Sequence, residues 1–564
     1  MVVFVPRISS SPVPPSAERL SPKSASSLWG LALWLTVAGN LPLWQKLLEL
    51  DQSLVQRGLL LAAMGVMLLG GTAALLSLVH WPRVYRLLAT ALVLVTAFNS
   101  YFMWQYHAVI DSTMLANVVH TDANEVRDLL SWRLVFAVVL IAGPALWWVW
   151  RRPMPVRSIW KHLGRNALGV VVGLALVVAA VLAGYQGLSS LMRNQKAVRY
   201  MINPVNSVYG AAVLLVEQLP REARVLKPVG EDAQLGASYA NQARAPLLLL
   251  VVGETARAQN WQLNGYPRPT TPKLAQWQTQ GDLVNFSQVS SCGTNTQVSV
   301  PCMFSPLTRE EGGALPPAEE NLLDVLQRAG LAVLWLDNQS GCKGVCDRVP
   351  SVVTRTLQLP GLCGEGECAD LVMVDGLDAR IEALDPARRA KGVVLVMHQM
   401  GSHGPAYFKR RPPDMRPFQP ECASATLSDC PPEQLVNAYD NTIAQTDAFL
   451  DSALQWLKAR ADQGTNDTGL IYMSDHGESL GEKGLYLHGV PYAFAPEQQT
   501  RVPMVSWLSP GLQKRADVSA TCLKGRSAEP VSHDNLFHTV LGLMEVATQV
   551  YAPTLDAFAP CREP

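Results

Sequence analysis

Five long apolar segments in the first 192 residues constrain the fold of this chain more than any other feature. None of them contains Lys, Arg, Asp or Glu, and each approaches or exceeds the ~20 residues that a helix needs to cross a lipid bilayer. We therefore expect an amino-terminal domain of five membrane-spanning helices. The expected spans are Leu28–Gln45, Gly58–Pro82, Leu87–Ile110, Leu134–Trp150 and Asn166–Met192.

The charges between these segments predict their orientation. The connections 83–86 and 151–165 are basic, whereas the connection 111–128 carries four acidic residues and one arginine. Because basic loops stay in the cytoplasm, we expect a cytoplasmic amino terminus and place the part after residue 192 outside. A cleaved signal peptide is the alternative for the first segment, but a polar lead of 27 residues and the lack of a clear small-residue cleavage site favour an uncleaved anchor.

The cysteines predict the same orientation independently. All ten lie after residue 250, and eight form pairs that are close in sequence, as disulfides of an oxidising compartment often do. A zinc site at Cys342 and Cys346 is the alternative, but the basic Lys343 and Arg348 and the missing second pair of ligands disfavour it. The expected pairs are Cys292 with Cys302, Cys342 with Cys346, Cys363 with Cys368, Cys422 with Cys430, and Cys522 with Cys561.

Composition excludes one broad class of function. The 564 residues are 49 % hydrophobic and carry no net charge, so the chain lacks the basic stripe of a nucleic-acid-binding protein. The expected partner is lipid. Residues 193–245 are mixed in charge and interrupted by three prolines, and we interpret them as a linker with an amphipathic helix at the membrane surface.

The remainder of the chain has the pattern of an α/β domain. Apolar runs alternate with segments of helical periodicity: the runs are 247–252, 331–336, 393–397 and 469–473, and examples of the helical segments are 321–329 and 435–460. Runs that are apolar on both faces and separated by helices indicate a largely parallel sheet. The predicted domains are a membrane domain (1–192), a linker (193–245) and an α/β catalytic domain (246–564).

Acidic and histidine side chains follow three of the apolar runs. In a parallel sheet, ligand-binding side chains lie beyond the carboxyl ends of the strands, and those ends meet in one crevice. A single carboxylate after a strand is usually a loop charge or a helix cap, but here the pattern recurs. Carboxylate and imidazole together suit a divalent metal such as zinc or manganese. The residues are Glu254, His398, His403, Asp475, His476, Glu478 and His488.

Residues 291–302 contain a candidate nucleophile. Two cysteines flank Thr294, Thr296 and Ser299 in this short stretch. A hydroxyl beside a bound cation has a lowered pKa, so it can attack at neutral pH without a separate histidine base. The alternative is an ordinary Ser/Thr-rich loop that caps a helix. Spacing alone does not choose between Thr294 and Thr296.

Five stretches of the chain carry a resemblance to a known family: VVGETAR (251–257), NGYPRPTTP (264–272), SCGTNTQVSVPCMFS (291–305), HQMGSHGPAY (398–407) and SDHGESLGEKGLYLHG (474–489). They resemble the bacterial phosphoethanolamine transferases, a family that modifies lipid A and includes polymyxin-resistance enzymes. The resemblance covers the α/β part nearly end to end and extends to the membrane part. It implies a sulfatase-like or alkaline-phosphatase-like domain, anchored in the inner membrane and facing the periplasm.

The resemblance implies roles for the catalytic candidates. It makes Thr296 the nucleophile. The ligand set that it implies for one tightly bound zinc ion is Glu254, Thr296, Asp475 and His476. His403 and His488 match family histidines near the metal, which bind a second zinc ion or the phosphate, and one of them protonates the leaving group.

The resemblance also implies substrate contacts. Lys343 matches a family lysine near the substrate phosphate, and Gln339 stands where the family commonly has Asn. Residues 112–126 resemble the substrate-binding segment of the family, although a capped surface helix is the alternative from the residues alone. The matching positions, which fall on one face of a helix, are Asn117, Thr121 and Glu125, the last as a partner for the ethanolamine ammonium.

The implied reaction has two steps, and we expect the enzyme to be a monomer. Thr296 takes phosphoethanolamine from phosphatidylethanolamine, releasing diacylglycerol, and a lipid A phosphate then accepts the group. The residues do not fix the acceptor, so a core sugar of lipopolysaccharide or a periplasmic glucan is an alternative, as is phosphoglycerol transfer from phosphatidylglycerol. A sulfatase is disfavoured because no Cys or Ser motif of that type surrounds Thr296. A non-enzymatic lipid sensor is disfavoured because every matched ligand is present.

Overall fold

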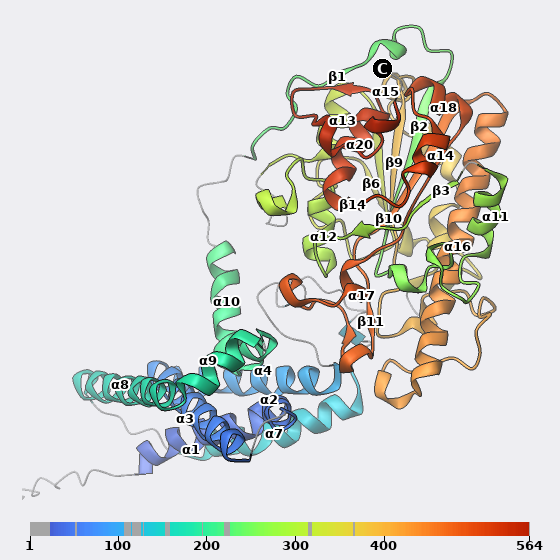
Figure 1. Cartoon of the computed structure of the whole chain (residues 1–564). Helices are drawn as coiled ribbons and strands as arrows, with labels where there is room; N and C mark the ends of the chain where they lie inside the picture. Colours follow the sequence, from blue (N-terminus) through green and yellow to red (C-terminus); the bar gives the residue numbers. More distant parts are fainter. Residues whose placement is uncertain are drawn as a thin grey trace, which may run out of the picture.

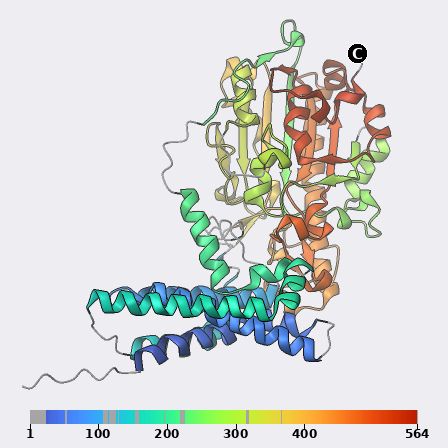
Figure 2. The ribbon, with the colours of Figure 1, turned by 60° about the vertical axis from the view of Figure 1, so that its left-hand side comes forward.

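The computed structural model describes residues 23–50, 54–106, 114, 126–127, 129–152, 158–194, 196–218, 226–281, 283–313, 319–364 and 367–562. These residues form a layer of long helices and, above it, an α/β domain (Figure 1). The helix α10 (Val205–Gln218) rises from the helical layer beside the α/β domain, as a view turned by 60° confirms (Figure 2).

Four helices in the described part of the chain are long and apolar enough to cross a membrane: α3 (Leu54–Leu78), α4 (Tyr85–Tyr106), α7 (Trp132–Arg151) and α8 (Ile159–Ala183). The helices α3 and α8 approach closely where Gly70 faces Gly173. A Cβ on either glycine would lie 2.5 Å from the backbone oxygen of the other. Small residues at this crossing therefore let the two backbones pack against each other, as is common between helices in lipid.

The prediction of five spanning helices is wrong for the first segment. Leu28–Gln45 is divided into α1 (Lys23–Val37), a 3-10 turn and α2 (Leu41–Leu48), and the 15 residues of α1 fall short of a full span. Pro42 stands in the first turn of α2, where its missing N–H costs nothing. The side chain of Asn40 donates to the carbonyl oxygens of Leu35 and Asn203, at 2.9 Å each, which ties the break to the chain ahead of α10.

The segment predicted as a linker is partly helical. It begins in α9 (Tyr185–Asn194), continues through a 3-10 helix (Lys196–Met201) and forms α10. Farther along, β1 (Gln234–Leu235) pairs with β15 (Val546–Ala547) of the α/β domain. The chain therefore joins the α/β domain before the first predicted strand.

A seven-stranded sheet forms the centre of the α/β domain, with the strand order β3-β13-β10-β2-β9-β5-β6. The five strands from β10 to β6 are parallel, β13 pairs antiparallel with β10, and β3 pairs antiparallel with β13. The predicted parallel sheet is thus confirmed, and all four predicted strands are in it. The bounds are β2 (Ala245–Gly253), β3 (Leu283–Phe286), β5 (Ala332–Asp337), β6 (Ser351–Val353), β9 (Val393–His398), β10 (Asn466–Ser474) and β13 (Met504–Leu508).

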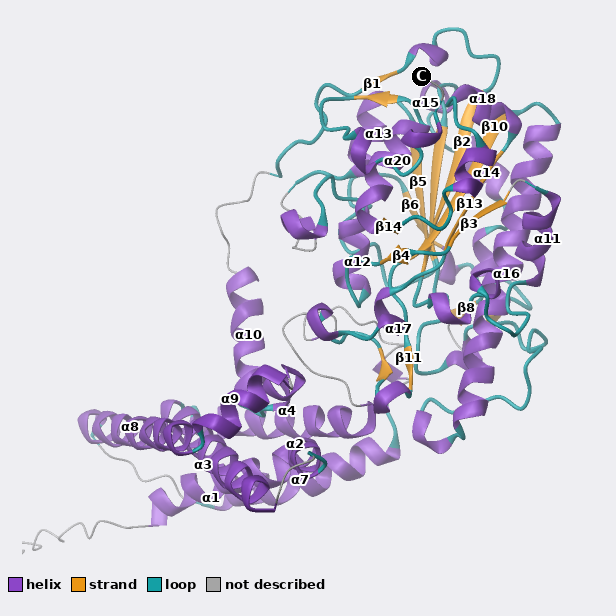
Figure 3. Cartoon of the chain, viewed as in Figure 1, coloured by secondary structure: helices purple, strands orange, loops and turns teal. Residues whose placement is uncertain are grey.

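Helices cover both faces of this sheet (Figure 3). Along β2, Leu248 and Leu250 belong to one buried cluster, whereas Leu247 and Leu249 belong to the other, because successive side chains of a strand point to opposite faces. The first cluster packs under α12 (Thr296–Met303), α13 (Leu322–Ala329) and α20 (Leu536–Leu543), and the second under α11 (Pro272–Gln280), α14 (Leu377–Glu382) and α16 (Pro432–Asp462).

Short elements complete the domain at its edges. The helices are α15 (Pro386–Arg389), α17 (Glu497–Thr500), α18 (Pro510–Arg515) and α19 (Ala520–Gly525), and the two-stranded pairs are β4 (Val289–Ser290) with β14 (Val531–Ser532), β7 (Cys363–Gly364) with β8 (Glu367–Cys368), and β11 (Ser479–Leu480) with β12 (Tyr486–Leu487).

All five predicted disulfides form, and the ten cysteines, every one of which lies in the described residues, leave no free thiol. The bond between Cys342 and Cys346 excludes the alternative of a zinc site there. Five disulfides are typical of a domain that folds in an oxidising compartment.

The α/β domain touches the membrane domain through its own loops. Asp429 forms an ion pair with Arg133 at the start of α7. Leu427 belongs to the same apolar cluster as Tyr106 and Leu134, at the facing ends of α4 and α7. In both ribbon views the carboxyl ends of the parallel strands are the ends nearer the membrane domain (Figures 1 and 2).

Candidate active site

Four predicted side chains meet at the carboxyl end of the sheet. Glu254 follows β2, Asp475 and His476 follow β10, and Thr296 is the first residue of α12. All four are at most 3 % exposed. One ligand atom from each of Glu254, Asp475 and His476 lies within 4.8 Å of the others, which is the spacing of a metal site.

The distances place these side chains around one point. Thr296 Oγ1 lies 3.1 Å from Glu254 Oε2 and 3.5 Å from His476 Nε2. His476 Nε2 in turn lies 3.4 Å from Glu254 Oε1 and 3.3 Å from Asp475 Oδ2. Two carboxylate oxygens, an imidazole nitrogen and a hydroxyl oxygen therefore converge from three separate elements.

The donors fit a divalent cation. Asp475 Oδ1 accepts hydrogen bonds from the backbone N–H groups of Thr255 (3.1 Å) and His476 (2.7 Å), whereas the buried Oδ2 has no hydrogen-bond partner among the described residues. Burial and the nearby Glu254 carboxylate raise the pKa of Asp475 well above its usual range. A cation between the two carboxylates would supply the missing partner and offset their repulsion.

Neighbouring groups hold the ligands in position. His476 Nδ1 lies 2.9 Å from the carbonyl oxygen of Gly477, which accepts the Nδ1 proton and leaves Nε2 free to bind a metal. Gln339 donates to Glu254 Oε2 at 2.9 Å, and Thr255 donates to Glu254 Oε1. Gln339, expected at the substrate, thus orients a metal ligand, and its substrate contact stays a prediction.

The structure separates the two candidate threonines. The hydroxyl of Thr294 donates to the carbonyl oxygen of Val490 at 2.7 Å, whereas the hydroxyl of Thr296 points to Glu254. Asn295 caps α12 by accepting from the N–H of Val298 at 3.1 Å, and this cap fixes Thr296 at the first helical position. The disulfide from Cys292 to Cys302 spans the same turn.

Two further predicted histidines adjoin the ligands. The ring centroid of His488 lies 4.4 Å from that of His476 and 5.3 Å from that of His403. Glu478 Oε2 lies 2.9 Å from His488 Nδ1, and its Oε1 accepts a hydrogen bond from Tyr407 at 2.7 Å. Glu478, seen in the sequence only as a charge after a strand, thus orients His488, and Tyr407 holds Glu478.

Of the remaining predicted site residues, Lys343 and His398 belong to the described part of the chain, and three others lie outside it. Lys343 follows β5, and its Nζ donates to Ser340 Oγ at 2.9 Å. His398 lies with Nε2 4.0 Å from Glu254 Oε2 and Nδ1 3.4 Å from Asp337. The three predicted substrate residues of the 112–126 segment, Asn117, Thr121 and Glu125, lie outside the described residues.

One described residue of that segment reaches the site. A Cβ added to Gly489 would lie 3.1 Å from Met114 Sδ, and Gly489 directly follows His488. Met114 therefore lies beside the chain neighbour of a predicted catalytic histidine.

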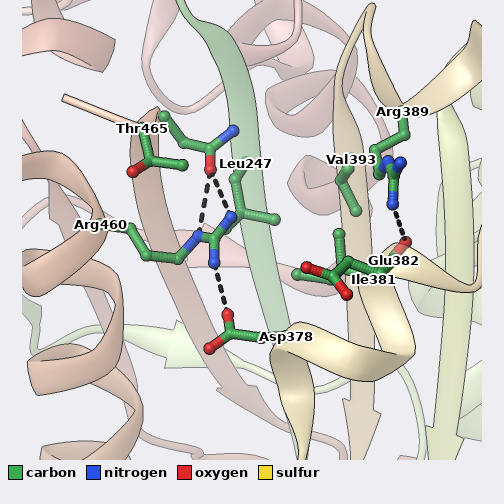
Figure 4. Close-up of a pocket in the computed structure, with 9 residues that line it drawn as sticks. Leu247, Asp378, Ile381, Glu382, Arg389, Val393, Arg460 and Thr465 are labelled. Atoms are coloured by element: carbon green, nitrogen blue, oxygen red, sulfur yellow. Dashed lines mark hydrogen bonds and ion pairs between the residues drawn. The ribbon is translucent and has the colours of Figure 1, made fainter. Parts of the chain in front are cut away.

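A cavity of about 540 Å³ lies at the other end of the sheet, away from the candidate site (Figure 4). Leu247 and Val393, near the starts of β2 and β9, form its floor. Arg460 pairs there with Asp378. Because the side chains of the candidate site follow the opposite ends of these strands, this cavity has no part in the site.

Comparison with known proteins identifies the family to which the chain is similar. The Sulfatase family matches residues 246–546, and the family described as phosphoethanolamine transferase EptA/EptB matches residues 68–219. The chain is 39 % identical to phosphoethanolamine transferase EptA of Escherichia coli, over 94 % of this chain and 96 % of the relative. It is 35 % identical to phosphatidylethanolamine transferase Mcr-2 of Escherichia coli, over 92 % and 95 %.

A solved structure covers nearly the whole chain. The integral membrane lipooligosaccharide phosphoethanolamine transferase A from Neisseria meningitidis matches with a TM-score of 0.87 and 34 % identity, over 96 % of this chain and 99 % of that one. The periplasmic domain of phosphoethanolamine transferase EptC from Campylobacter jejuni is 37 % identical, with a TM-score of 0.51, and covers 60 % of this chain.

Proposed function

The chain belongs to the phosphoethanolamine transferase family, and from that premise we propose that it transfers phosphoethanolamine from phosphatidylethanolamine to a phosphate of lipid A, with Thr296 as the nucleophile. The observation that carries the proposal is the hydroxyl of Thr296, buried 3.1 Å from Glu254 beside Asp475 and His476. The relatives named for phosphoethanolamine transfer, and the one named Mcr-2, support the reaction class.

We propose zinc as the metal. Glu254, Thr296, Asp475 and His476 would hold one ion, and the unpartnered Asp475 Oδ2 supports this assignment. When bound, the ion supplies Lewis-acid stabilisation for the negative charge of the reacting phosphate. His403 and His488 are proposed as the place for a second ion. Manganese would also suit so oxygen-rich a ligand set, so metal analysis of the purified chain tests the assignment.

In the first half-reaction, Thr296 Oγ1 attacks the phosphorus of phosphatidylethanolamine. Glu254 Oε2 accepts the hydrogen bond of that hydroxyl and is therefore placed to take its proton. The bond from phosphorus to the glycerol oxygen breaks, and His403 or His488 gives the departing oxygen a proton, releasing diacylglycerol. Phosphoethanolamine is left as an ester of Thr296.

In the second half-reaction, an oxygen of the lipid A phosphate attacks the phosphorus of this ester. The bond from phosphorus to Thr296 Oγ1 breaks, and Glu254 returns the proton to the threonine oxygen. Lys343 and Gln339 are proposed to contact the phosphate that is transferred. Asn117, Thr121 and Glu125 are proposed to bind the donor headgroup, Glu125 through the ethanolamine ammonium. The contact of Met114 with Gly489 supports this placement, since it brings their segment to the catalytic domain.

We propose that the enzyme works as a monomer in the bacterial inner membrane, with its catalytic domain in the periplasm. The five disulfides and the long apolar helices support this location. Donor and acceptor are both confined to the bilayer, so a membrane-anchored enzyme meets them at a high effective concentration.

Mass spectrometry of lipid A from a susceptible Gram-negative host tests the proposal. Expression of the wild-type chain should add the mass of phosphoethanolamine to lipid A, and Thr296→Ala should abolish the addition. Thr294→Ala is the matched control, because it removes a hydroxyl that donates to Val490 rather than to a ligand, and it should keep the addition. Full modification by Thr296→Ala would refute the mechanism, whereas product on core sugars or glucans would change the acceptor.

A further inference from the structure

A second cavity, of about 370 Å³, lies beside the 3-10 helix Tyr407–Lys409 in the loop that follows β9. We propose that this cavity binds a phosphate of the glycolipid acceptor other than the phosphate that is modified. The inference rests on the proposed function and names the part of the acceptor that the enzyme recognises. We call the cavity the acceptor cavity; its described lining is residues 361–364, 367, 369, 408, 409, 411–413 and 416.

One short turn separates the acceptor cavity from the catalytic centre. In the 3-10 helix Tyr407–Lys409, Tyr407 donates to Glu478, which holds His488, while Phe408 and Lys409 line the cavity. On the same turn, Arg410 Nε donates to the carbonyl oxygen of His403 at 2.8 Å. This turn therefore connects the wall of the cavity to Glu478, the partner of His488, and to the backbone of His403.

The charge of the lining suits an anion. Among the described lining residues, three are cationic (Lys409, Arg411 and Arg416) and one is acidic (Glu367), so this part of the lining has a net positive charge. Arg411 is already paired with Glu421. Glu367 is itself paired with the buried Arg410, so its negative charge is already offset. A phosphate is the anion that Lys and Arg side chains bind through charge-assisted hydrogen bonds.

The wall of the cavity leads to the membrane domain. Arg411 forms an ion pair with Glu421, whose chain neighbour Cys422 is in a disulfide with Cys430. Asp429, next to Cys430, pairs with Arg133 at the start of α7. These contacts connect the wall of the cavity to the end of the α/β domain that touches the membrane domain.

The cavity of about 540 Å³ in Figure 4 differs from the acceptor cavity in both position and charge. It is larger, but it opens at the strand ends away from the membrane domain, and its Arg460 is matched by Asp378 and by Asn466 at 2.9 Å. Both position and charge therefore favour the acceptor cavity for a membrane-bound anion.

A contact away from the reacting phosphate would position the acceptor for attack, since binding energy from remote groups orients the reacting atoms. The expected consequence is selectivity: an acceptor with two phosphates should react faster than one with a single phosphate. We expect the ratio of kcat/KM for these two acceptors to be roughly tenfold, the effect of one well-made charged contact.

The test uses the full-length enzyme in vesicles that contain labelled phosphatidylethanolamine, bisphosphorylated lipid A and monophosphoryl lipid A. The two acceptors compete in the same vesicle, so the product ratio does not depend on the amount of active enzyme. Lys409→Gln and Arg416→Gln should each lower the preference of the wild type several-fold. Lys514→Gln, which removes an exposed cation of α18, is the matched control and should keep the preference.

Each outcome bears on the inference. A wild-type enzyme without preference, or variants at Lys409 and Arg416 that keep it, would overturn the acceptor cavity. Failure of the proposed function looks different: the wild type would then release no diacylglycerol from phosphatidylethanolamine and modify neither acceptor. An equal loss of preference in Lys514→Gln would also overturn the inference, because it would show an effect of overall charge.

Discussion

Gly401 is a position where one added methyl group should displace Glu254, a proposed metal ligand. A Cβ on Gly401 would lie 2.4 Å from the backbone oxygen of Glu254 and 3.0 Å from its Cβ. The backbone oxygen belongs to the turn that follows β2, so it cannot move without moving the Glu254 carboxylate. Gly401→Ala should therefore disturb the carboxylate that faces Thr296.

Gly376 provides the control for backbone strain. Its φ of 64° is close to the 52° of Gly401, so alanine at either position adopts the left-handed conformation at a cost of ~1–2 kcal/mol. A Cβ on Gly376 meets no atom within 4 Å, however. The difference between the two variants therefore isolates the clash with Glu254, for which overpacking costs of ~1–3 kcal/mol are typical.

The effect on catalysis should exceed the effect on stability. A displacement of about 1 Å in a reacting group costs roughly 100-fold in rate. We expect Gly401→Ala to lose about that factor in transfer from labelled phosphatidylethanolamine and to bind less metal, whereas Gly376→Ala keeps the wild-type rate. Equal transfer rates for the two variants would refute the reasoning, since both would then carry only backbone strain.

Three further predictions concern other parts of the molecule. Glu478→Gln should slow transfer about 10–100-fold with little change in Tm, because it removes the charge that orients His488; an unaltered pH profile of kcat would contradict this role. Burial raises the pKa of Asp447 to about 7 in the folded chain. Between pH 4 and 7 the unfolded chain therefore loses this proton while the folded chain keeps it, so a rise in pH lowers the free energy of unfolding. The Tm of the wild type should accordingly fall over that range relative to Asp447→Asn, and parallel curves would argue against it. In α8, Gly173→Ala should lower the Tm because its Cβ would lie 2.5 Å from the backbone oxygen of Gly70. Gly164→Ala, whose Cβ would have no described atom within 4 Å, should leave the Tm equal or higher. Similar shifts of the Tm in the two variants would exclude close packing of α3 on α8.

The central strands could be predicted because burial on both faces leaves continuous apolar runs. The edge strands could not: β6 is three residues long, and its pattern of partial exposure resembles a loop. The interruption of the first membrane segment could not be predicted either. It depends on Asn40, whose partner Asn203 lies 163 residues away, and local periodicity carries no sign of so distant a hydrogen bond.

The cluster of side chains that could hold a metal was predictable from the sequence for a topological reason. Glu254, Asp475 and His476 each follow a predicted strand, and parallel strands bring their carboxyl ends together. The choice of Thr296 over Thr294 was not available from spacing, because it depends on the bond from Thr294 to Val490, 196 residues away. Side-chain geometry of this kind exists only after the elements have packed.

The topology also explains why a long segment separates the membrane helices from β2. The ligands of a parallel sheet follow the carboxyl ends of its strands, and those ends must face the bilayer if the substrates are lipids. The strand β2 must therefore begin at the far side of the sheet, and its nine residues span about 30 Å at ~3.3 Å each. From α10 the chain first has to pass the whole height of the sheet, and the pairing of β1 with β15 secures it there before β2 returns toward the membrane with Glu254 at its end. A linker too short to reach that far side would leave Glu254 on the wrong end of the sheet.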